Sequence, residues 1–193
     1  MVRRYVDRPV PTDLVDHLLD LAVRAPSAGF SQGWAFVVLE GVEQTSVFWS
    51  AVADERWTAE VDSKGWHLAK APVVIVPLAN KQAYLDRYAE PDKAHTGMAD
   101  EAAWPIPFWL TDVAFATEHL LLGATDAGLG ALFFGLPSGH ERLLAALGVP
   151  VGHQALGAVA LGWPDPQDAP SPSLQRGRRP LDEVVHRGGW SGS

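Results

Sequence analysis

Apolar residues recur along the chain in two patterns, helical spacing and continuous runs, and the alternation of the two predicts the secondary structure. Helical spacing predicts helices over residues 12–25, 42–70 (two helices broken near 53–57), 111–127 and 138–147. We place Thr12 and Thr111 at helix N-caps, Asp112 in the first turn of its helix and Gly128 at the C-terminal cap of the same helix.

Continuous apolar runs predict the strands that lie between these helices. The runs are residues 34–39, 73–78, 129–134 and 154–161. Residues 73–78 read Val-Val-Ile-Val-Pro-Leu, which is typical of a strand covered on both faces. Because such strands alternate here with helices, we expect a layered α/β or α+β domain.

Two segments fit neither pattern. Residues 80–110 hold several prolines, which exclude long regular structure, and we interpret them as a lid or insertion. Residues 164–193 form a Pro-rich tail with too few apolar residues for a core of its own, so we expect an arm that packs on another surface, such as a partner subunit. The chain is therefore expected to form one domain, residues 1–193, with this C-terminal arm.

Composition narrows the class of protein. Hydrophobic residues make up 47% of the 193 residues and charged residues 20%, which excludes disorder over most of the chain. A formal charge of -8 argues against binding to nucleic acid or to an anionic membrane. The absence of Cys excludes disulfides, thiolate metal sites and a Cys nucleophile. Without a long apolar run or a signal-peptide pattern at residues 1–8, a cytoplasmic location is expected.

Tryptophan and arginine are distributed unevenly. Most of the eight Trp residues fall in 49–66 and 104–109, where we expect a core, an interface or a pocket for a planar ligand. Basic residues gather at the two ends of an otherwise acidic chain, as Arg3, Arg4 and Arg8 and as Arg176, Arg178 and Arg179. These clusters are either solvated faces or two halves of one anion site.

The motifs of hydrolases and metalloproteins are absent. No Gly-x-Ser-x-Gly elbow occurs, the seven His residues show no metal-ligand spacing, and Gly128-Leu129-Gly130 lacks the context of a dinucleotide fingerprint. We therefore expect no metal and no hydrolytic chemistry. Separated arginines beside the small-residue loop 26–33 are consistent with a phosphate-bearing planar cofactor.

Six short segments, spread along nearly the whole chain, form an ordered series. The first is residues 3–5 together with 9–10, the second is 25–34 and the third is 70–72. The fourth is residue 112 together with 127–130, the fifth is 161–164 and the sixth is 176–185. The most specific is 25–34, Ala-Pro-Ser-Ala-Gly-Phe-Ser-Gln-Gly-Trp. In this order the segments resemble the nitroreductase family of FMN-dependent oxidoreductases.

The resemblance implies an α+β, three-layer α/β/α nitroreductase-like fold with a mostly antiparallel central sheet. It also implies a homodimer in which the C-terminal arms are exchanged and two FMN sites straddle the interface. The residues implied to bind FMN are Arg3, Arg4, Pro26, Ser27, Ala28, Gly29, Gln32, Gly135, Leu136, Arg176 and Arg178. The backbone of Gly135 and Leu136 is implied to lie near flavin N5, so that no catalytic side chain is needed.

The implied activity is the NAD(P)H-dependent reduction of nitro, quinone or other conjugated acceptors, which are small planar organic substrates, by ping-pong hydride transfer. Either NADH or NADPH is a possible reductant. The chain departs from the family pattern at Phe30, where Asn is usual, and at Gly33, where Pro is usual. Two alternatives stay open: a flavin-binding or flavin-sequestering protein with little turnover, and a specialised flavin-dependent dehydrogenase of a biosynthetic pathway.

Overall fold

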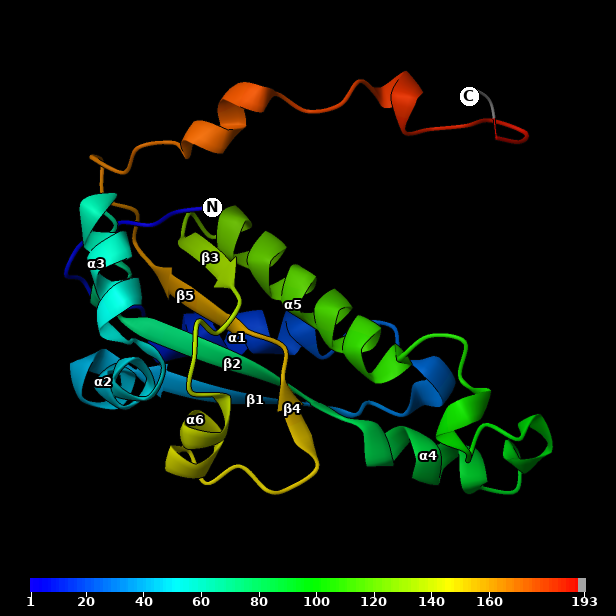
Figure 1. Ribbon diagram of the computed structural model, residues 1–193. Helices are drawn as coiled ribbons and strands as arrows, with labels where there is room; N and C mark the ends of the chain where they lie inside the picture. The colour runs from blue at the N-terminus through cyan, green and yellow to red at the C-terminus, as the bar shows by residue number, and fades with distance from the viewer. Residues whose placement is uncertain (191–193) are drawn as a thin grey trace.

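An antiparallel sheet of five strands forms the centre of the protein in a computed structural model that describes residues 1–190 (Figure 1). Four strands lie in the order β1, β2, β5, β3, and β4 pairs with the end of β2 beyond β5. The strands are β1 (Trp34–Glu40), β2 (Val73–Asn80), β3 (Gly130–Phe134), β4 (His153–Ala155) and β5 (Ala158–Gly162). Every pairing is antiparallel, as expected.

Strand β2 divides the core into two layers, because successive side chains of a strand point to opposite faces. Val74, Val76 and Leu78 pack against the layer of α2 (Gly41–Val52), α3 (Glu55–Ser63) and α6 (His140–Ala146). Val73 and Ile75 pack against α1 (Thr12–Ala22) and α5 (Phe108–Asp126). Helices thus cover both faces, which confirms the three-layer α/β/α architecture and the double-sided burial predicted for residues 73–78.

Residues 81–107, which we call the α4 extension, leave the sheet at the end of β2 (Figure 1). The extension contains α4 (Lys81–Ala89) and two short 3-10 turns, Ala94–Thr96 and Glu101–Ala103. It has a small aromatic core in which Tyr84, Tyr88 and Trp104 meet Trp109 of α5. Its role as a lid stays a prediction.

The helix boundaries differ from those predicted. Helix α1 ends at Ala22 rather than at residue 25, and the Thr12 hydroxyl bonds Glu40 instead of capping the helix. Helix α5 begins at Phe108, directly after Pro107, so Thr111 does not cap it. Asp112 is consequently not in the first turn. Gly128, with φ of 72°, follows the last turn of α5 as expected.

The predicted strand 154–161 is two strands, because regular strand structure is interrupted at Gly157. Directly after β4, the Leu156 amide donates a hydrogen bond to the Pro77 carbonyl of β2. At Gly157 the backbone passes so close to β3 that a Cβ would lie 2.6 Å from the Phe134 carbonyl oxygen. This close approach redirects the chain into β5.

The N-terminal segment is joined to residues 164–168, which follow β5. Tyr5 forms a β-bridge with Pro164, the Asp165 amide bonds the Arg4 carbonyl, and the Arg3 amide donates to Asp168 Oδ1 at 3.0 Å. Residues 164–168 of the predicted arm are therefore part of the body. Beyond them the chain projects away through two 3-10 turns, and we call residues 169–190 the arm (Figure 1). Residues 191–193 of the predicted arm lie outside the described residues.

Within residues 1–190, no helix combines the length and the apolar character that crossing a membrane requires.

Candidate functional site

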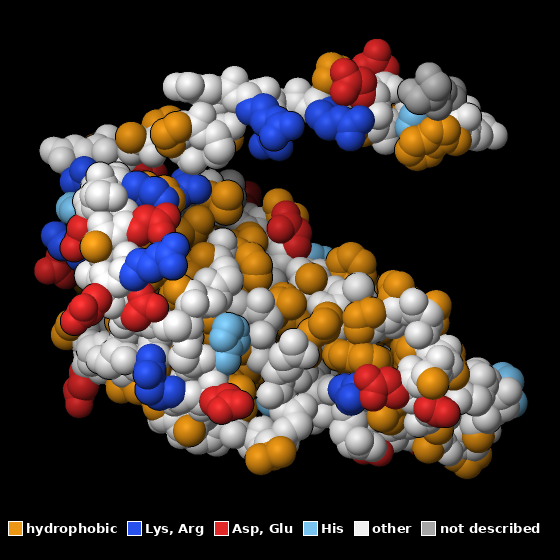
Figure 2. Space-filling model, in the orientation of Figure 1, with side chains coloured by type: hydrophobic (Ala, Val, Ile, Leu, Met, Phe, Trp, Pro, Cys, Tyr) orange, Lys and Arg blue, Asp and Glu red, His pale blue; other side chains and the backbone are white. Residues whose placement is uncertain are grey.

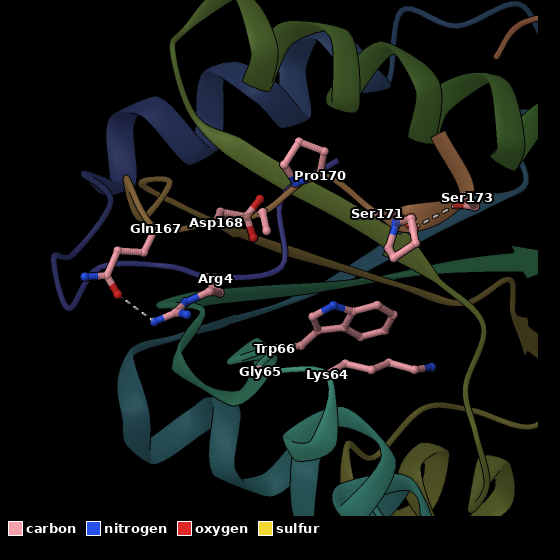
Figure 3. Close-up of a pocket in the computed structure, with 11 residues that line it drawn as sticks. Arg4, Lys64, Gly65, Trp66, Gln167, Asp168, Pro170, Ser171 and Ser173 are labelled. Carbon is pink, nitrogen blue, oxygen red and sulfur yellow. Dashed lines mark hydrogen bonds between the residues drawn. The ribbon is translucent and has the colours of Figure 1, made fainter. Parts of the chain in front are cut away.

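A cavity of about 450 Å³ lies where the N-terminal segment meets residues 167–173 (Figure 3). Arg4 comes from the N-terminal segment, Lys64, Gly65 and Trp66 come from the turn after α3, and residues 167–173 supply the remaining wall. The pocket therefore lies at the root of the arm.

The arginines of the N-terminal segment have few acceptors. Arg3 is only 9% exposed, and its guanidinium carbon lies 4.9 Å from the centre of the Trp66 ring. No ion pair within residues 1–190 involves Arg3. Arg4 donates through Nη2 to Gln167 at 3.2 Å and forms an ion pair with Asp165, whose Oδ2 lies 3.7 Å from Nε. The buried Nε has no hydrogen-bond acceptor within residues 1–190. The two guanidinium groups thus place positive charge at this corner, beside the carboxylates of Asp165 and Asp168.

Arg176 and Arg178 lie on the arm. Both are exposed, and neither forms an ion pair or a hydrogen bond through its side chain with any residue in the described range 1–190. Their neighbour Arg179 differs, since it bonds the side chain and the carbonyl of Glu183. The basic side chains of the arm stand apart from the body in Figure 2. The chain thus brings Arg3 and Arg4 to the root of the arm, but not to Arg176 and Arg178.

The 26–33 loop has an unusual backbone. Gly29, Phe30 and Gln32 have φ of 61°, 56° and 50°, all in the left-handed region. For the two residues that are not glycine, this conformation costs of the order of 1–3 kcal/mol each, so the surrounding contacts must impose it. Phe30 is 74% exposed and gains no burial in return.

A buried carboxylate holds the start of this loop. Asp112 of α5 is 2% exposed, and its Oδ2 accepts hydrogen bonds of 2.8 Å from the Ala28 amide and from the Tyr84 hydroxyl. Burial raises the pKa of Tyr84 well above its usual value, with Asp112 adding to the rise, so the phenol stays protonated and donates. This role was not predicted from the sequence, although a charged residue among the apolar positions of a helix was an available signal.

Arg87 of α4 holds the middle of the loop. Its Nε donates to the Gly29 carbonyl at 2.9 Å, while its two terminal nitrogens bind both oxygens of Asp92 at 2.7 Å. A Cβ on Gly29 would lie 2.6 Å from the Tyr88 ring. The α4 extension therefore fixes the shape of the 26–33 loop.

Gly135 and Leu136 follow β3. Leu136 is 8% exposed and packs in the core, whereas Gly135 is exposed and a Cβ on it would meet no atom within 4 Å. The backbone at Gly135 is therefore open to a ligand. Gln32 is exposed, and its backbone amide donates a hydrogen bond to the Ser27 hydroxyl.

Within one chain the candidate residues form four separate groups. These are Arg3 with Arg4, the 26–33 loop, Gly135 with Leu136, and Arg176 with Arg178. No hydrogen bond or ion pair within residues 1–190 joins one group to another. The contacts within a single described chain therefore leave these four groups unconnected.

The tryptophans are mainly core residues. Trp49, Trp104 and Trp109 are each 8% exposed, and Trp49 stacks on Trp57 and on Phe134. Trp49, Trp57 and Trp66 also line a second cavity, of about 320 Å³. Within residues 1–190, no group of three His, Asp or Glu side chains is arranged to hold a metal ion.

Comparison with known proteins gives the class. Residues 1–163 match the Nitroreductase family, and the chain belongs to that family, which is one of oxidoreductases. The NADH dehydrogenase of Thermus thermophilus is 32% identical over 95% of this chain and 89% of its own. A putative NADH dehydrogenase/NAD(P)H nitroreductase of Archaeoglobus fulgidus is 28% identical, covering 84% of this chain and 79% of its own.

Solved structures confirm the fold. The nitroreductase family protein of Streptococcus pneumoniae has a TM-score of 0.71 at 19% identity, covering 96% of this chain and 94% of its own. A nitroreductase family protein of Clostridium difficile has a TM-score of 0.69 at 20% identity, covering 98% and 93%. The sequence-based prediction of a nitroreductase-like fold is confirmed.

The Arg87–Asp92 pair predicts a pH dependence of stability. Hydrogen bonds from Arg87 lower the pKa of Asp92 to about 2, below the unfolded value of about 3.9. The stabilisation is therefore complete above the unfolded pKa and is lost as the pH falls through 2. We expect the melting temperature of the wild type to fall more between pH 4 and pH 2 than that of Asp92→Asn. The difference is small, because the Asp92 side chain is exposed.

Asp86→Asn is the matched control, since Asp86 lies on α4 and bonds only Gln82. It should keep the wild-type dependence on pH. Parallel melting curves for the wild type and Asp92→Asn would contradict the assignment.

Proposed function

We propose that the protein is an FMN-dependent oxidoreductase that uses NAD(P)H to reduce nitro, quinone or other conjugated acceptors, in a ping-pong sequence and as a homodimer. The observation that carries the proposal is the buried Arg3, which has no anionic partner within residues 1–190, in a chain of the nitroreductase family. The printed names of the Thermus and Archaeoglobus relatives support a nicotinamide reductant. The cytoplasmic location expected from the sequence stays a prediction.

The residues present fit a phosphate-bearing cofactor. Within residues 1–190 the Arg3 guanidinium and the Nε of Arg4 have no hydrogen-bond acceptor, and a phosphate group supplies several acceptor oxygens in a geometry that guanidinium groups match. Arg176 and Arg178 supply two further cations that are unpaired within the described chain. When bound, FMN supplies the two-electron chemistry that amino-acid side chains lack.

Each group of candidate residues has a role in this proposal. The four arginines bind the phosphate. The backbone at Gly135 and Leu136 approaches the reacting part of the ring, which the open space at Gly135 permits. The ring system and the ribityl chain are bordered by the 26–33 loop, through Pro26, Ser27, Ala28, Gly29 and Gln32.

A second copy of the chain is the proposed means of bringing these groups together. The arm exposes Leu174, Leu181 and Val184, by 65%, 71% and 48%. Helix α5 exposes Phe115 by 50% and Leu122 by 60%, and hydrophobic side chains gather over α5 in Figure 2. Apolar surface on both the arm and the body favours an exchange of arms between subunits.

Anaerobic reduction tests the proposed function. The purified protein, loaded with FMN where needed, should be yellow, should bleach on addition of NADH or NADPH, and should regain colour with a quinone or a nitroaromatic compound. Colour without bleaching would favour the flavin-sequestering alternative. A protein that cannot be loaded with FMN would contradict the proposal.

Arg178→Ala should weaken FMN binding by about 1.5–3 kcal/mol, because it removes a charge-assisted hydrogen bond to phosphate. Titration of the apoprotein with FMN measures the change. Arg179→Ala is the matched control: Arg179 is adjacent, but it is already bound to Glu183. Equal FMN affinities of the two variants would show that Arg178 does not bind the phosphate.

Deletion of residues 169–193 should yield a protein that neither dimerises nor retains FMN, because both functions depend on the arm. The truncation leaves residues 164–168 in place, so the contacts of Tyr5 with Pro164 and of Arg3 with Asp168 persist. Sedimentation measures assembly and absorbance measures flavin content. A truncated dimer with full FMN content would show that the arm serves neither purpose.

A further inference from the structure

Asp112 is a buried carboxylate without a cation. It is 2% exposed, and no ion pair within residues 1–190 involves it. Its Oδ2 accepts from the Ala28 amide and the Tyr84 hydroxyl, and the Thr111 hydroxyl lies 3.3 Å from Oδ1. Burying a charge without a counter-ion is unfavourable unless hydrogen bonds compensate for the lost water. These donors are therefore the reason that the carboxylate is tolerated.

The hydrogen bonds of Asp112 serve the 26–33 loop rather than the helix on which it lies. Within residues 1–190 no backbone amide of α5 donates to it, whereas the amide of Ala28, 84 residues away in the sequence, does. The Tyr84 ring that reaches the same oxygen also packs against Gly33, where a Cβ would overlap it. One carboxylate thus joins the beginning of the loop, through Ala28, to the side chain that supports its end.

This arrangement determines which amides of the loop remain available. The amides of Ala28, Phe30, Ser31 and Gln32 all donate within the protein. The amide of Gly29 donates to no acceptor within residues 1–190. Asp112 thus occupies the Ala28 amide and leaves the adjacent Gly29 amide, at a position without a side chain, available to a ligand.

We propose that Asp112 is a positioning residue for the cofactor: through Ala28 and Tyr84 it sets the left-handed shape in which the 26–33 loop meets the flavin ring. The inference rests on the proposed function, because it assumes that this loop borders FMN. Asp112 itself is buried behind Ala28 and affects cofactor binding only through the loop.

Three substitutions remove different parts of the arrangement. Asp112→Ala removes both hydrogen bonds to Oδ2 and the contact of Thr111 with Oδ1. Asp112→Asn keeps an acceptor oxygen without the charge, and Tyr84→Phe keeps the ring beside Gly33 but removes the hydroxyl. Thr117→Val is the control, because Thr117 is buried on the same helix and its hydroxyl bonds only the Val113 carbonyl. If Asp112→Ala fails to fold, Asp112→Asn and Tyr84→Phe still test the proposal.

Two measurements are made on each variant that folds. Amide hydrogen exchange of residues 27–33 in the apoprotein reports the shape of the loop. An FMN titration reports the affinity of the protein for the cofactor. Asp112→Ala should speed exchange at Ala28 and weaken FMN binding, each by about tenfold or more, as expected for a lost hydrogen bond to a charged group. Asp112→Asn should be intermediate, and Thr117→Val should match the wild type in both measurements whatever its melting temperature.

The two measurements separate the possible failures. Unchanged exchange at Ala28 in Asp112→Ala would overturn the proposal, because the loop would then keep its shape without the carboxylate. Faster exchange with unchanged FMN affinity would also overturn it, since the loop shape would not matter to the cofactor. A wild-type protein that binds no FMN would overturn the proposed function, while the exchange data would still decide whether Asp112 shapes the loop.

Discussion

Strand β2 imposes the main constraint on this protein, because seven of its eight residues are buried. Since neighbouring side chains on a strand face opposite ways, both faces of the sheet need an apolar cover, and helices supply it on each side. The strand also runs directly into α4 at Asn80, whose side chain caps that helix. The position of the α4 extension, and through it the 26–33 loop, follows from where β2 ends.

The loop shows how a local conformation that is unfavourable on its own becomes fixed. Its left-handed residues would not keep this conformation in an isolated peptide. In the protein they are fixed by hydrogen bonds from the loop to Asp112 and Arg87 and by packing against the aromatic rings of α4. The shape of the loop therefore depends on the packing of two elements, α4 and α5. Rigid elements that position a small loop are a common basis for a precise ligand site.

The sequence predicted what depends on local pattern. The burial of residues 73–78 followed from their uniform apolar character, and the ordered motifs identified the family. Ala25 shows the limit of periodicity: it is 6% exposed and belongs to the same core cluster as α1, so apolar spacing continues past the end of the helix. The role of Asp112 was not predictable from pattern, because its partners Ala28 and Tyr84 are distant in sequence and only packing brings them together.

The distribution of the candidate residues has a thermodynamic consequence for the proposed enzyme. Arg3 and Arg4 belong to the body, whereas Arg176 and Arg178 belong to an arm whose exposed leucines and valines need another surface. If the docked arm completes the phosphate site, docking must strengthen FMN binding. By linkage, FMN must then strengthen docking by the same factor. Cofactor and subunit assembly would then each stabilise the other.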